Sequence, residues 1–272
     1  MKDILIYLTF IVGLFVFIGC EKEEFSLNSN ENNAIDIHVS SNNATNICVP
    51  GYSSNAFDSI GILHNYWVGY IESLCYPDDS IQRVIYVTDS VLLGEFGQSF
   101  SSCLWDLDDI EDFKDEFETD SLTSYFNGLN ISSLEKSHIL DFRDILITYD
   151  GTNVCDIIDD IKDYEDDIMS SYSSSQIVYS LIGATIARHS IYYWDQSANS
   201  INSGYNLEVR ANWKWLKYTL MGLADVAGGI GGGLAGSTFG PWGTFAGSVT
   251  GGVSASNGMA KLWDAFGGKK SS

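Results

Sequence analysis

Glycines recur at four-residue steps in the last quarter of this 272-residue chain, and this spacing constrains the fold more than any other feature. The repeated positions are Gly228, Gly232, Gly236, Gly240, Gly243, Gly247 and Gly251. Four-residue spacing aligns such glycines along one stripe of a helix, where a second backbone can approach closely. Pro241-Trp242 interrupts the series. Because proline and glycine punctuate helices, the pattern predicts a hairpin of two glycine-faced helices.

The hairpin region carries no charged side chain from 226 to 260. Each glycine costs about 1 kcal/mol relative to alanine in a helix interior, so these helices need close packing or a lipid environment. Arms of about 14–18 residues would be about 21–27 Å long, which is short of a hydrocarbon core of roughly 30 Å. Three arrangements of 226–260 remain open: packing within the protein's own bundle, insertion into a membrane, and a flexible tail.

Tryptophans and lysines flank the glycine-rich region. Trp213 and Trp215 precede it and Trp263 follows it. Aromatic and cationic flanks are typical of segments that meet a membrane interface. In this respect residues 207–272 resemble glycine-zipper membrane segments and the glycine-rich part of small bacteriocins. The resemblance implies a membrane-active, bacteriocin-like effector.

Apolar residues between 48 and 206 recur mainly at helical spacing. This predicts an all-α fold, a helical bundle with the glycine-rich hairpin at its C-terminal end. Ser132 and Glu135 form a capping-box pattern at the start of one helix, and Ser80 precedes another. The remaining helices are expected over 60–71, 154–169 and 176–194 and from about Leu207, with a polar loop over 195–206.

The charge of the chain is strongly negative and uneven. The net charge is −22, with −26 on the first 208 residues and +4 on the rest. An acidic surface of this kind repels nucleic acid and anionic headgroups. We therefore expect no nucleic-acid partner, and a different environment or partner for the C-terminal segment.

The N-terminal residues have the features of an export signal. An uncharged apolar run from 4 to 19 ends at Cys20. Such a run is too short for an ordinary spanning helix and suits a signal-peptide core. Phe17-Ile18-Gly19-Cys20 resembles a bacterial lipobox, in which the cysteine is acylated and becomes the mature N-terminus.

The residues after Cys20 add to this resemblance. Glu21-Lys22-Glu23-Glu24 is similar to the tag of surface-exposed lipoproteins from Bacteroidetes-type bacteria. The resemblance implies a signal peptide over 1–19 and a lipid anchor in the outer membrane. We expect a flexible tether over 20–47, since it is rich in asparagine, serine and glutamate. An acidic α-helical domain over 48–206 and the glycine segment over 207–272 complete the predicted organisation.

Four cysteines follow Cys20, namely Cys48, Cys75, Cys103 and Cys155. An even number in an exported protein suggests two disulfides, with three pairings possible, although buried free thiols are an equal alternative. No Cys-x-x-Cys spacing occurs, which disfavours a zinc ribbon.

Candidates for chemistry are few. His64, His138 and His189 could act as bases or metal ligands, but no His-Glu-x-x-His pattern is present. The acidic runs over 106–120 and 156–167 lack a calcium-loop pattern and suit helices with acidic solvent faces. We expect no cofactor and no metal site, and no catalytic residue can be named. The favoured function is a non-enzymatic envelope interaction or structural protein. The alternatives are the membrane-active effector and a metal-dependent hydrolase that uses the histidines.

Overall fold

The computed structural model describes residues 48–76, 79–97, 100–118, 122–149, 153–201 and 211–267. The helices in these ranges belong to one compact unit, and the ranges contain no strand. The predicted all-α fold is therefore confirmed. The predictions for the leader 1–19, for Cys20 and for the tether 20–47 lie outside the described residues.

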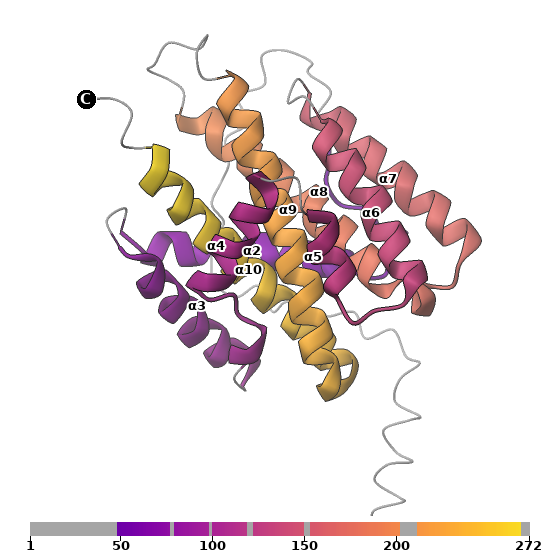
Figure 1. The fold of residues 1–272 in the computed structure, drawn as a ribbon, viewed down its shortest axis with the longest axis horizontal. Helices are drawn as coiled ribbons and strands as arrows, with labels where there is room; N and C mark the ends of the chain where they lie inside the picture. Colours follow the sequence, from indigo (N-terminus) through magenta and orange to yellow (C-terminus); the bar gives the residue numbers. More distant parts are fainter. Residues whose placement is uncertain are drawn as a thin grey trace, which may run out of the picture. The chain divides into compact units, whose positions relative to one another are not determined.

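The described chain is a succession of helices, coloured along the sequence in Figure 1. They are α2 (Asp58–Leu74), α3 (Ile81–Phe96), α4 (Leu107–Glu118), α5 (Leu122–Gly128), α6 (Ser133–Thr148), α7 (Val154–Ser171), α8 (Val178–Ile201), α9 (Ala211–Gly236) and α10 (Gly240–Gly267). Short 3-10 turns occur at Ser101–Cys103, Ser174–Gln176 and Ser237–Phe239.

Local signals position several of these helices. The side chains of Ser80 and Ser132 accept hydrogen bonds from the backbone N–H groups of Arg83 and Glu135, as N-caps do. One boundary was predicted wrongly, because α8 continues to Ile201 and includes part of the loop expected over 195–206. No proline or glycine occurs between Trp194 and Ile201, so nothing local ends the helix at Trp194.

The glycines of α9 and α10 face each other in pairs. Gly228 meets Gly251, Gly232 meets Gly247, and Gly236 meets Gly243. A Cβ atom on any of these glycines would overlap a carbonyl oxygen of the opposite helix. The predicted glycine-faced hairpin is thus present, with its two backbones in direct contact.

Gly240 is an exception among the seven predicted packing glycines. Nothing lies within 4 Å of the position of its missing Cβ, and its φ is +76°. Because side chains disfavour this left-handed region, Gly240 forms the turn between the helices and not their interface. Pro241 follows in the first turn of α10, where its missing N–H is not needed.

The hairpin lies in the core of the helical unit. Val226, Ile230, Val249 and Val253 are buried, and α9 and α10 pack against α8, α2 and α3. The structure therefore contains the self-packed arrangement, and residues before and after 206 do not form separate bodies. The arms contain 26 and 28 residues, longer than expected, because both helices extend into the flanks. Among the described helices, none has the length and apolar character needed to cross a membrane.

Candidate functional site: two buried polar clusters

A carboxyl group is buried where α9 meets α8 and α10. The side chain of Asp225 is fully buried, and its Oδ2 accepts hydrogen bonds from the hydroxyls of Ser190 and Ser256. Burial disfavours the charged form and raises the pKa of Asp225 to about 8. Asp225 is therefore mainly protonated at neutral pH, which keeps the hairpin core uncharged.

His64 of α2 completes this group, which we call the Asp225 cluster (His64, Ser190, Asp225 and Ser256). Its Nε2 lies 3.7 Å from Asp225 Oδ2, and burial lowers the pKa of His64 to about 4. Asn65 uses its amide nitrogen to donate to the carbonyl oxygen of His189, so its Oδ1 faces His64 Nδ1 at 3.0 Å. This arrangement selects the tautomer in which Nδ1–H donates to Asn65.

The Asp225 cluster contains serine, histidine and aspartate, the residue types of a hydrolytic triad, but their arrangement in space differs from that of a triad. In such a triad the histidine lies between the nucleophile and the acid, because it must take the proton of the nucleophile. Here Asp225 lies between Ser190 and His64, and each of the three side chains is at most 1% exposed. With Ser256 of α10 included, the cluster joins four helices, and its geometry is not suited to acyl transfer.

A second group surrounds Arg188, whose side chain is fully buried in α8. Its Nε donates to Glu165 Oε2 of α7 at 2.8 Å, and its Nη2 donates to Asp58 Oδ1 of α2 at 2.9 Å. Asn55 donates to Glu165 Oε1 at 2.6 Å, and Arg188 also contacts the carbonyl oxygen of Pro50. We call these residues the Arg188 cluster. It joins the segment before α2 to three helices of the bundle, α2, α7 and α8.

Two acids compensate the buried guanidinium, and their pKa values move in opposite directions. Burial opposes ionisation of Asp58, but hydrogen bonds from His189, the Tyr52 backbone N–H and Arg188 outweigh it and hold the pKa of Asp58 well below its usual range. Burial raises the pKa of Glu165, although Arg188 counteracts this effect. Removing Arg188 would leave the buried carboxyl of Glu165 without its cation, and breaking a buried pair in this way typically costs about 3–5 kcal/mol.

The three histidines considered as catalytic candidates do not meet. His64 belongs to the Asp225 cluster, and His189 lies beside Asp58 with its Nε2 3.2 Å from Oδ1. His138 lies on α6, edge-on to Tyr172. In the part of the chain that the structure describes, no three His, Cys, Asp or Glu side chains are grouped so that they could hold a metal ion.

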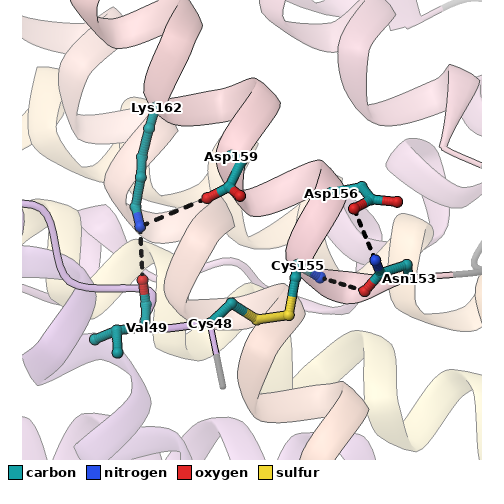
Figure 2. Close-up of a disulfide and its surroundings, with 7 residues drawn as sticks. All are labelled: Cys48, Val49, Asn153, Cys155, Asp156, Asp159 and Lys162. Carbon is teal, nitrogen blue, oxygen red and sulfur yellow. Dashed lines mark hydrogen bonds and ion pairs between the residues drawn. A yellow bond between two sulfur atoms is a disulfide. The ribbon is translucent and has the colours of Figure 1, made fainter. Parts of the chain in front are cut away.

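A disulfide fastens the start of the described chain to α7, as Figure 2 shows. Cys48 is bonded to Cys155, with Cα atoms 5.2 Å apart. Nearby, Lys162 Nζ donates to the carbonyl oxygen of Val49 at 2.8 Å. The backbone beside Cys48 is therefore held to α7 by a covalent bond and a charge-assisted hydrogen bond.

The other two cysteines are free, so the second expected disulfide is absent. Cys75 follows the end of α2, whereas Cys103 is buried in a small cluster with Phe100 and Ala246. These different locations explain why they are not paired. Burial raises the pKa of the Cys103 thiol, which lowers its reactivity.

The acidic helix α7 has the expected solvent face with one exception. Asp159, Asp160, Asp163, Asp166 and Asp167 are exposed, and the isoleucines between the acids are buried. Glu165, in contrast, is fully buried against Arg188.

Neither polar cluster was predicted, yet the sequence contains a signal for each. Arg188 is the one charged residue of the apolar stretch 177–194, and Asp225 is the one acid between 209 and 263. An isolated charge in an apolar helix needs a buried partner, which the sequence does not identify.

Comparisons with known proteins found no counterpart. No protein-family model matches the chain, and neither the curated proteins nor the solved structures include a significantly similar one.

Proposed function

We propose that the protein is an exported lipoprotein, acylated at Cys20 and anchored in the outer membrane of a bacterial cell. Its helical domain acts without catalysis, as an interaction or structural protein of the cell envelope, and is surface-exposed. The polar clusters support the non-enzymatic role, because their titratable groups are used to join helices.

The Cys48–Cys155 disulfide carries this proposal. Disulfides persist in oxidising compartments outside the cytosol, which agrees with the lipobox-like residues that end at Cys20. The bond also lies at the first described residues, next to the predicted tether. A force or motion at the tether would therefore act on α7 through a covalent bond.

Intact mass analysis of the protein from its native cells tests the proposal. We expect the mass to show loss of residues 1–19 and a thioether-linked diacylglycerol on Cys20. In a detergent–water phase separation, the protein should partition into the detergent phase. Cys20→Ser should abolish both the acylation and the partition, whereas Cys75→Ser, the matched control, should leave both unchanged. An unmodified thiol at Cys20 on a chain that retains its first nineteen residues would overturn the proposal.

One observation favours a second candidate, a membrane-active effector. The paired glycines of α9 and α10 contact each other, and 226–260 carries no charged side chain. The contact between the two helices would therefore persist if the hairpin left the bundle and entered a membrane. The intact protein should then release dye from liposomes at micromolar concentration. Absence of release would reject this candidate.

A further inference from the structure

The turn between α9 and α10 exposes two large aromatic side chains. Phe239 is 60% exposed and Trp242 is 52% exposed. Pro241 between them is exposed as well. Figure 1 shows this turn at the lower edge of the helical unit, where the orange and yellow helices join. We call Phe239–Trp242 the aromatic tip.

Both rings of the tip are held in place by other aromatic side chains. Trp242 stacks on Phe245 with ring centroids 5.5 Å apart and meets the edge of Phe96 at 5.9 Å. Phe239 meets Phe100 edge-on at 6.1 Å. Their remaining surface is therefore presented in a fixed orientation, and little side-chain entropy is lost when another surface covers it.

The tip differs from the rest of the protein in charge. The chain has a net charge of −22, but no charged side chain occurs from 226 to 260. A strongly basic partner would meet no acidic side chain at the tip. An anionic surface would be repelled by the negative charge of the rest of the molecule. A partner of no net charge with an apolar layer close to its surface is the best match.

The size of the tip argues against a protein partner or a second copy. Two half-exposed aromatic side chains offer on the order of 200 Å², since each buries about 150–250 Å² in full. A stable protein interface needs about 800 Å² from each partner. A small contact is sufficient, however, for a molecule already held at a membrane, because the anchor makes the second contact intramolecular.

We propose that the aromatic tip docks into the interfacial layer of the net-neutral bilayer that holds the acyl anchor, while α9 and α10 stay packed in the bundle. Tryptophan suits this layer, because its apolar ring meets the acyl chains while its N–H group meets water, and the apolar ring of phenylalanine adds contact with the acyl chains. The inference rests on the proposed acylation at Cys20 and adds a second point of membrane contact.

Fluorescence quenching by brominated lipids tests the tip directly. The mature acylated protein is reconstituted into phosphatidylcholine vesicles with bromine near the headgroup end of the acyl chains. We expect quenching of tryptophan emission that falls at least threefold in Trp242→Phe and is insensitive to added salt. Trp105→Phe, which removes a buried tryptophan, is the matched control and should leave the quenching unchanged.

The possible outcomes distinguish docking of the aromatic tip from membrane attachment through the acyl anchor. Equal quenching in the wild type and Trp242→Phe, or none in either, would overturn the docking of the tip. Stronger quenching by bromine at the bilayer centre, together with dye release, would also overturn it, because the whole hairpin would then have inserted. The mass of the N-terminal peptide reports acylation independently. If the chain proves unacylated, the proposed function fails. The tip is then tested by adding excess vesicles to the free protein and comparing the quenching of the wild type with that of Trp242→Phe.

Discussion

Asp225 and Arg188 show two ways in which this protein accommodates an ionisable group away from water. Asp225 is kept neutral, with its carboxyl group held by two serine hydroxyls. Arg188 stays charged, because a guanidinium does not lose its proton in a protein, and two acids balance it. The first solution makes the contribution of Asp225 to stability depend on pH.

Asp225→Asn should remove this pH dependence. The carboxyl group of Asp225 has a pKa of about 8 in the native state and of about 4 in the unfolded chain. At this group the native state therefore binds more protons between these values, so the contribution of Asp225 to the free energy of unfolding falls as pH rises from about 4 to about 8. The neutral amide should make the protein more stable than the wild type at pH 8, by on the order of 2–5 kcal/mol.

Urea unfolding at several pH values measures this effect. The gain from Asp225→Asn should shrink toward pH 5, where the wild-type carboxyl is already protonated. Asp163→Asn changes an exposed acid on α7 and serves as the control, with no expected change. A variant that is less stable than the wild type at pH 8 would show that Asp225 is charged in the folded protein.

Among the elements, α9 and α10 depend most on the absence of side chains. Neighbouring glycines of α9 have different surroundings, which allows a matched comparison. The missing Cβ of Gly232 points at the backbone of Gly247, whereas that of Gly231 has as its nearest neighbour the hydroxyl of Tyr125 at 3.8 Å. Alanine would gain about 1 kcal/mol of helix propensity at either position.

Gly232→Ala and Gly231→Ala should therefore change stability in opposite directions. The first must push the helices apart, and overpacking of this kind costs about 1–3 kcal/mol, which should exceed the gain in propensity. The second should raise the free energy of unfolding by up to about 1 kcal/mol. Thermal and urea unfolding of the two variants give the comparison. Equal effects would mean that the glycine interface is not formed.

At the scale of the whole molecule, the Cys48–Cys155 bond closes a loop with a sequence separation of 107 residues. A cross-link over such a distance restricts the unfolded chain, which stabilises the fold by about 4–5 kcal/mol in the loop-entropy model. Reduction should lower the free energy of unfolding by about this amount, as measured by urea unfolding with and without reductant. Cys48→Ser should reproduce the loss, and Cys75→Ser should not. An unchanged urea midpoint after reduction would contradict this role.

Local signals explain what could be predicted from the sequence. Caps at Ser80 and Ser132 act within one turn, and the glycine repeat reflects a contact between consecutive helices. The polar clusters could not be predicted, because they join residues far apart in the chain. Arg188 meets Asp58 across 130 positions, and no periodicity specifies that pairing. The burial of Glu165 within an acidic run has the same cause.

The whole fold depends on burial of the glycine hairpin in the core of the helical unit. Native-state hydrogen exchange of the acylated protein on vesicles tests this burial most directly. We predict that the amides of 224–230 and 249–255 exchange only through global unfolding, with the same free energy as the most protected amides of α8. Exchange of these hairpin amides at a clearly lower free energy, while α8 stays protected, would contradict this role of the hairpin.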